Sequence, residues 1–333
     1  MQKDGPSEAG PFHELEAEMR GAVAFALAIS ASVLVLGPAS AQRAPTTGSA
    51  STAAPVAAPA PTDIPALIPA QNTPAPKCTN PNALGVSRTV EIDTNGGPGF
   101  GFEHFKQHDF LRNNEVLLTF DDGPWPTTPL VLKALADECV RATFFSIGKH
   151  ATYYPEILKQ VIEGGHTVGS HTWSHADLSR KSTEEAKEEI EKGISAVSMA
   201  VGPAASPIFR FPALRHPPEA VTYLGQRNVA IWSTDMDSFD FKMRKPEQVV
   251  ASVMAKLKKH GKGIVLMHDF QQPTAHAVAD LLAQLKAGGY KIVHMKTKDS
   301  IATIKQYDDM LIKEQKLPTV SQRPTSSVVR TVE

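Results

Sequence analysis

The chain has 333 residues, 41% of them hydrophobic, which is enough for a sizeable core in one or two domains. Its 34 lysines and arginines nearly balance its 35 aspartates and glutamates, so the formal net charge is −1. This balance argues against nucleic acid or an anionic membrane surface as the partner, and a neutral polymer fits at least as well.

The first recognisable element is an apolar segment near the amino terminus. Residues Arg20–Ala41 combine a basic residue, a short apolar run and an Ala-Ser-Ala ending, which predicts a secretory signal peptide cut after Ala41. The alternative is a retained membrane anchor, which Pro38 and the small residues after the run disfavour. Because residues 1–18 are acidic and ill suited to a signal, we expect translation to start at Met19 and region 1–41 to be lost on export.

Two segments without strong periodicity follow. Residues 42–78 are rich in Pro, Ala, Thr and Ser and lack the apolar pattern of a core, so we expect a disordered, extended linker without chemistry. Residues 79–112 contain the run RTVEID and the turn NGGPGFG, which predict a strand or hairpin in an N-terminal extension.

The two cysteines, Cys78 and Cys139, lack the CxxC spacing of a zinc site. In an oxidising compartment they can form one disulfide. The alternative is two unpaired thiols, with Cys139 buried.

From Glu115 onward, β-rich runs alternate with amphipathic helical stretches in roughly seven β/α units. The β-rich runs are EVLLTF, ATFFSI, HTVGS, PIFRF, VAIWS, GIVLMHD and YKIVHM. This alternation predicts an α/β domain over residues 113–297 with a parallel sheet, open or closed into a barrel. After it, residues 298–333 predict a helix in DSIATIKQYDDMLIKEQ and a disordered tail.

The first group of candidate site residues ends the first strand of this domain. Asp121 and Asp122 would face opposite ways on a straight strand, but Gly123-Pro124 predicts a turn that brings both carboxylates to one site. The alternative is an Asx turn with solvated carboxylates.

Two histidines follow the third strand. The spacing of His171 and His175 suggests one face of a helical turn, from which two nitrogens and a carboxylate could bind a catalytic metal ion. Two surface histidines are the alternative, and His166 is expected to cap or orient the loop.

Other polar residues fall at the remaining strand ends. His268 could donate a proton, although a structural histidine is the alternative, and Arg210 could hold a carboxylate. Asp235, Asp237 and Asp240 follow the fifth strand, and some of them are expected to be loop acids.

The motifs TFDDG, H-T-x-x-H, R-x-P, D-S-F-D-F and L-x-H, in this order over residues 113–297, resemble the pattern of the NodB-like polysaccharide deacetylases, carbohydrate esterase family 4. The resemblance implies a distorted (β/α)7-type barrel and a divalent metal ion, usually zinc. It covers neither the signal region, the linker nor the tail.

The resemblance also implies a role for each matching residue. Asp121 matches the catalytic base, Arg210 the arginine paired with it, His268 the general acid and Asp240 the carboxylate that orients this acid; Asp122, His171 and His175 match the metal ligands, and Leu266, Pro212 and Phe241 fall in substrate-binding motifs. Two positions depart from the pattern: Phe241 replaces a tryptophan, and Leu214 stands where glycine is common.

The function implied is an exported hydrolase that releases acetate from N-acetylglucosamine in peptidoglycan, a chitin-type polymer or an exopolysaccharide. The alternatives are an O-acetyl esterase acting on a xylan-like polymer and a non-catalytic glycan-binding module. Nucleic acid is disfavoured as a partner, and no stable membrane insertion is expected once the signal is removed. The expected location is the periplasm, cell envelope or medium.

Overall fold

The computed structural model describes residues 65–69 and 77–314. The predicted signal peptide, most of the linker and the predicted tail lie outside these residues. Within the described ranges, no helix is both long enough and apolar enough to cross a bilayer.

Short strands and amphipathic helices alternate along the described chain. The strands are β1 (Ile68–Pro69), β2 (Arg88–Ile92), β3 (Gly99–Phe100), β4 (Glu115–Asp121), β5 (Thr143–Ser146), β6 (Thr167–Ser170), β7 (Ala205–Phe209), β8 (Ala230–Trp232), β9 (Met236–Asp237), β10 (Gly263–His268), β11 (Lys291–Thr297) and β12 (Asp299–Ser300). The α-helices are α1 (Thr128–Asp137), α2 (Gly148–Tyr153), α3 (Pro155–Glu163), α4 (Thr183–Val201), α5 (Pro218–Gln226), α6 (Pro246–His260), α7 (Gln272–Ala287) and α8 (Lys305–Glu314). Single 3₁₀ turns are η1 (Leu178–Arg180), η2 (Gly202–Ala204), η3 (Pro212–Leu214) and η4 (Asp240–Lys242).

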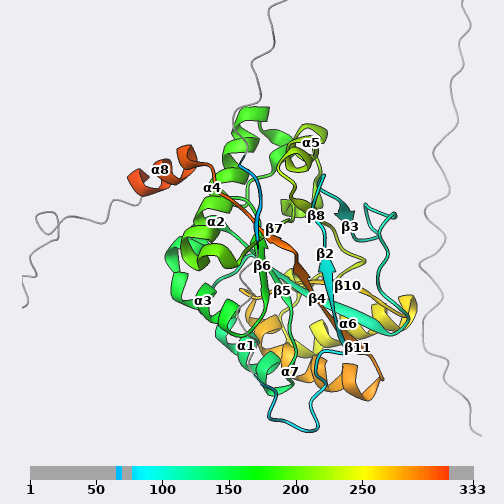
Figure 1. The fold of residues 1–333 in the computed structure, drawn as a ribbon. Helices are drawn as coiled ribbons and strands as arrows, with labels where there is room; N and C mark the ends of the chain where they lie inside the picture. Colours follow the sequence, from blue (N-terminus) through cyan, green and yellow to red (C-terminus); the bar gives the residue numbers. More distant parts are fainter. Residues whose placement is uncertain (1–64, 70–76, 315–333) are drawn as a thin grey trace, which may run out of the picture. The chain divides into compact units, whose positions relative to one another are not determined.

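The main sheet is parallel throughout and has ten strands. Its order is β2-β11-β4-β5-β6-β7-β8-β3, while β10 pairs with β4 and β9. Helices follow seven strands, β4 to β8, β10 and β11, with the two-residue strands β9 and β12 inserted after β8 and β11. Figure 1 shows α1 to α4 along one flank of these strands and α6 and α7 along another. Because β8 pairs with β3, and β10 with β9, the ring of strands is not closed by direct pairing between β8 and β10. The predicted distorted (β/α)7-type barrel is confirmed.

Local sequence explains these elements. All seven residues of β4 are buried, as expected for a central parallel strand covered on both faces. Helix α4 begins with a reciprocal capping box between Ser182 and Glu185, and α6 ends at Gly261 in the left-handed conformation. These signals fix where each helix starts or stops, and hence where the connecting loops lie.

The structure refines two predictions at the edges of the domain. The predicted strand at residues 88–92 is present, but β2 and β3 do not form a hairpin with each other: β2 pairs with β11 and β3 with β8, so both extend the main sheet. The last helix starts only at Lys305, because Asp299–Ser300 pairs with β1 as a short antiparallel ladder. Cys78 and Cys139 form a disulfide, which resolves the two alternatives for these residues.

Two buried histidines lie in the domain away from the candidate site. His166 is 7% exposed, and its Nδ1 accepts a hydrogen bond of 3.0 Å from the amide of Ala142. Burial, together with the nearby His294 and the charge of Arg141, lowers the pKa of His166 to about 3. Burial likewise lowers the pKa of His294 to about 4.

These shifts predict acid sensitivity. Because the folded-state pKa of His166 is below its ordinary value of 6.5, protonation favours unfolding: its contribution is fully present above about pH 6.5 and is lost as the pH falls toward 3. We expect about 2 kcal/mol of unfolding free energy to be lost through this residue between pH 6.5 and 5. In His166→Asn, where the amide oxygen can replace Nδ1, chemical denaturation should show a correspondingly smaller loss over this range. An equal loss in both proteins would contradict the assignment.

Candidate active site

The residues predicted to carry chemistry gather at the carboxyl ends of β4, β6, β7 and β10. The parallel register places His268 directly beside Asp121, and Ser170 opposite Phe209. His171, the residue after β6, and Arg210, the residue after β7, are therefore neighbours. Carboxyl ends of parallel strands meet at one edge of a sheet, which is why residues so distant in sequence converge here.

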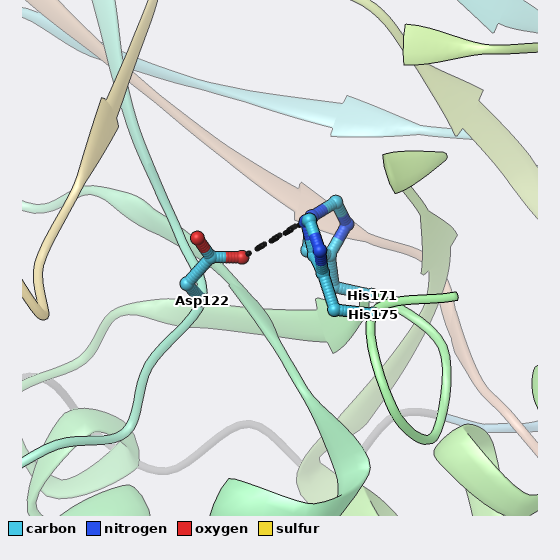
Figure 2. A group of neighbouring side chains, drawn as sticks. All are labelled: Asp122, His171 and His175. Atoms are coloured by element: carbon cyan, nitrogen blue, oxygen red, sulfur yellow. Dashed lines mark ion pairs between the residues drawn. The ribbon is translucent and has the colours of Figure 1, made fainter. Parts of the chain in front are cut away.

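Three side chains form a candidate metal site. Asp122 Oδ1 lies 3.5 Å from His171 Nε2 and 3.4 Å from His175 Nε2, and Figure 2 shows the carboxylate facing both imidazoles. One ligand atom from each residue lies within 4.8 Å of the other two. Donor atoms around one tetrahedral zinc ion would lie about 3.3–3.6 Å apart, given bonds of about 2.0–2.2 Å. The spacing therefore fits a metal ion.

The protonation state of His171 also favours a metal ion at this position. Its Nδ1 lies 2.7 Å from the carbonyl oxygen of Arg210, so Nδ1 carries the proton and Nε2 turns a lone pair toward Asp122. Burial lowers the pKa of His171 to about 3, which keeps the ring neutral. The buried Asp122 Oδ1 has no hydrogen-bond partner among the described residues. A lone pair facing an unpartnered carboxylate oxygen is repulsive unless a cation lies between them.

The predicted helical turn for these histidines is wrong. Residues 171–177 form a loop, in which Thr172 and His175 have positive φ angles of 68° and 60°. The amide of His175 donates to Thr172 Oγ1 at 3.0 Å, and the amide of Trp173 donates to the carbonyl of Glu189 at 2.8 Å. The loop, rather than helical periodicity, brings the two imidazoles together.

The predicted turn after β4 is present and separates the two carboxylates. Asp122 has a φ of 72°, a conformation that aspartate tolerates better than most residues. Asp122 therefore faces the histidines, whereas Asp121 Oδ1 accepts a bond of 2.7 Å from Arg210. Burial raises the pKa of Asp121, although the charge of Arg210 opposes this shift.

Arg210 is fully buried and held from every side. Its guanidinium donates to Thr119 Oγ1 at 2.7 Å and to the carbonyl oxygen of Ser233 at 2.8 Å, and it lies 4.3 Å from the centre of the Phe145 ring. The predicted bidentate pair with a carboxylate is not formed, because only one guanidinium nitrogen contacts Asp121. Arg210 instead fixes one oxygen of Asp121 and leaves the other available.

His268 and Asp240 form a second charged pair. His268 Nδ1 lies 2.6 Å from Asp240 Oδ1, and Asp240 Oδ2 accepts bonds from the His268 amide at 2.7 Å and from Thr274 Oγ1 at 2.6 Å. Burial opposes the charged ring, but the hydrogen bond and charge of Asp240 and the charges of Asp121 and Asp122 raise the pKa of His268 to about 9. His268 Nε2 lies 3.9 Å from Asp122 Oδ2, so a protonated ring stands beside the metal site.

Comparison with known proteins agrees with this arrangement. The sequence profile described as polysaccharide deacetylase matches residues 111–231. A chitooligosaccharide deacetylase of Bradyrhizobium sp. is 30% identical over 199 residues, which are 55% of this chain and 90% of that protein. The chain belongs to the polysaccharide deacetylase family.

Other members of the family are also similar. A peptidoglycan-N-acetylglucosamine deacetylase of Listeria monocytogenes is 36% identical over 187 residues, which are 54% of this chain but only 38% of that protein. The structure of a peptidoglycan deacetylase of Bdellovibrio bacteriovorus has a TM-score of 0.59 at 30% identity and covers 70% of this chain and 65% of its own. A family pseudoenzyme of Bacillus anthracis has a TM-score of 0.50 at 25% identity, covering 55% of this chain and 66% of its own.

The structure locates the two positions that depart from the polysaccharide deacetylase pattern, Leu214 and Phe241, and the other predicted substrate-binding residues. Ala213 and Leu214 both have positive φ, at 51° and 53°, which explains why glycine suits this turn and why Leu214 is strained there. Pro212 is buried at the start of η3 and Leu266 is buried in β10. Phe241 is 49% exposed, with its ring centre 5.8 Å from that of His268.

The remaining predicted acids bond to backbone amides. Asp235 accepts from the amides of Phe102 and Ile264, and Asp237 accepts from the amide of Phe239. Both are loop acids that hold backbone, as expected for part of this segment.

Sequence reasoning missed two residues next to the metal site. His150 Nδ1 lies 2.6 Å from the carbonyl oxygen of Asp122 and so fixes its backbone. Asp269 is fully buried against Gly123, accepts from Thr128, and has its pKa raised to about 7 by burial and by the charge of Asp122. Its position directly after His268 was the only available signal.

Proposed function

We propose that this protein is an exported, metal-dependent hydrolase that removes N-acetyl groups from an N-acetylglucosamine-containing polysaccharide. The observation that carries the proposal is the convergence of a three-ligand metal site with Asp121 and with the His268–Asp240 pair at the same end of the sheet. Similar proteins named as deacetylases of peptidoglycan, chitin and chitooligosaccharides support this class of substrate.

Zinc is the metal ion that we propose. Two imidazoles and one carboxylate form a catalytic rather than a structural set, because three ligands leave positions open. When bound by Asp122, His171 and His175, a zinc ion would polarise the amide carbonyl and make a water molecule more acidic.

The protein's own residues supply the proton transfers. Asp121, held by Arg210 through one oxygen, accepts the proton of the attacking water. The water oxygen adds to the carbonyl carbon and gives a tetrahedral adduct, and the carbon–nitrogen bond then breaks as His268 donates its Nε2 proton to the departing nitrogen. Asp240 holds Nδ1 and so keeps Nε2 directed at the site. The products are acetate and a free amino sugar.

Export is part of the same proposal. The predicted signal peptide lies outside the described residues, but the disulfide between Cys78 and Cys139 supports an oxidising compartment. A periplasmic, envelope or extracellular polymer is the corresponding substrate.

The decisive experiment measures acetate released by the purified protein from peptidoglycan, N-acetylglucosamine oligomers and acetylated xylan, before and after chelation and after zinc is restored. An Asp121→Asn preparation made in parallel serves as the blank. We expect chelator-sensitive release from an amino-sugar polymer. Release from xylan alone would make the protein an O-acetyl esterase, and no release from any polymer with zinc present would leave a glycan-binding module, as the similarity to a pseudoenzyme allows.

A further inference from the structure

Two exposed aromatic rings lie beside the candidate active site. Phe239 is 42% exposed and Phe241 is 49% exposed, their ring centres are 6.1 Å apart, and Phe241 faces His268 at 5.8 Å. Phe241 falls in a substrate-binding motif of the family, but no function follows from that motif for Phe239. Their place beside the candidate active site makes these two rings candidates for contact with a substrate.

The loop that carries Phe239 is held in a strained conformation. Phe239 has a φ of 56°, which is unusual for a bulky residue. Its amide donates to Asp237 Oδ1 at 2.8 Å, Lys256 Nζ donates to the carbonyl of Asp237 at 2.7 Å, and Ser252 Oγ donates to the carbonyl of Ser238 at 2.7 Å. Strain maintained by so many bonds is typical of functional surfaces, and here it keeps a phenyl ring in solvent.

Two lysines lie over the Phe239 ring, and one of them also reaches Phe241. Lys256 Nζ is 4.4 Å from the centre of the Phe239 ring and is bonded to the carbonyl of Asp237. Lys242 Nζ lies 4.7 Å from the centre of the Phe239 ring and 5.4 Å from that of Phe241. Within residues 65–69 and 77–314, no carboxylate lies within 4.0 Å of the Lys242 ammonium group. The neighbouring Arg244 is also exposed, and Lys245 lies 4.0 Å from Glu247. Asp237, an acid of the same loop, accepts from the amide of Phe239. The surface formed by Phe239, Phe241 and Lys242 therefore combines apolar ring surface with a lysine that no described carboxylate pairs with.

We propose that Phe239 and Lys242 form a binding subsite for the sugar next to the one that is deacetylated, and that this subsite selects glycans carrying carboxylates. The phenyl ring offers a flat surface to the C–H face of a sugar, and the ammonium group above it attracts an acidic substituent. The proposal rests on the proposed function for the identity of the neighbouring reaction.

Two substrates that differ only in their carboxylates test the proposed preference for acidic glycans. Soluble peptidoglycan glycan strands with free carboxylates are compared with the same strands after amidation, by kcat/KM for acetate release. We expect Lys242→Glu to lower kcat/KM about five- to ten-fold on the acidic strands with little change on the amidated strands, because a partly exposed charge pair is worth about 1 kcal/mol. Lys242→Arg should retain the preference, and Phe239→Ala should raise KM on both strands.

Lys259→Glu is the control, because it makes the same charge change near the carboxyl end of α6, where the side chain is exposed. Equal effects of Lys242→Glu on both strands, or an effect of Lys259→Glu as large, would overturn the subsite. Binding of both strands to the Asp121→Asn variant, measured by calorimetry, separates the two proposals. If no strand yields acetate, the proposed function fails, and the ratio of the two affinities with and without Lys242→Glu still decides the subsite.

Discussion

Replacing His268 by alanine is expected to lower kcat for deacetylation by about 10²- to 10⁴-fold, the usual contribution of a general acid. The amine is a poor leaving group unless it is protonated, and His268, with its pKa raised to about 9, holds a proton beside the metal site at neutral pH. The fold should persist, because Asp240 keeps its bonds from Thr274 and from the backbone amide of residue 268. Acetate release from an N-acetylglucosamine oligomer checks the loss.

A substrate with a different leaving group tests proton donation by His268 more directly. An activated acetate ester, whose leaving group needs no proton, should be hydrolysed by His268→Ala at nearly the parent rate. Asp240→Asn should act in the same direction, because Asp240 is a positioning residue that works through His268, and the double variant should be no slower than His268→Ala alone. His276→Ala, on the exposed face of α7, is the control. Equal losses on the amide and the ester would argue against proton donation.

Replacing Glu191 by glutamine is expected to lower the free energy of unfolding by about 3–5 kcal/mol. Glu191 and Arg227 are both buried, and the carboxylate accepts from Arg227 Nε at 2.7 Å and from the Tyr223 hydroxyl at 2.8 Å. Arg227 also donates to the carbonyl of Ala302 at 2.8 Å, so the pair joins α4 and α5 to the segment before α8. The substitution would leave a buried cation without its counter-charge. Chemical denaturation at pH 7 measures the loss.

An exposed ion pair in the same protein serves as the comparison. Lys133 and Asp137 on α1 lie 2.6 Å apart but are 71% and 61% exposed. We expect Asp137→Asn to change stability by less than about 1 kcal/mol. If Glu191→Gln were equally mild, the buried pair would make no net contribution. Changing Glu191 and Arg227 together to methionine should recover much of the loss, because no charge then remains buried.

The sequence predicted most of the domain because its signals are local. Continuous apolar runs such as that of β4 indicate buried parallel strands, and residues such as Asp121 and His268 stand out as polar residues where these runs end. Parallel strands place their carboxyl ends together, so position along the strand was enough to group these residues into one site. The same reasoning failed for His171 and His175, because regular spacing was interpreted as a helix where positive φ angles form a loop.

The sequence by itself determined the alternation of strands and helices and the family, and it predicted the candidate site residues at the strand ends, because hydrophobic periodicity and short motifs depend only on neighbouring residues. Only the tertiary structure decided that β2 and β3 join the main sheet, that Cys78 and Cys139 pair, that Asp269 and His150 stand behind Asp122, and that Lys242 lies over Phe239. These features depend on contacts between chain segments far apart in sequence or on loop backbone angles. Neither leaves a periodic signal in the sequence.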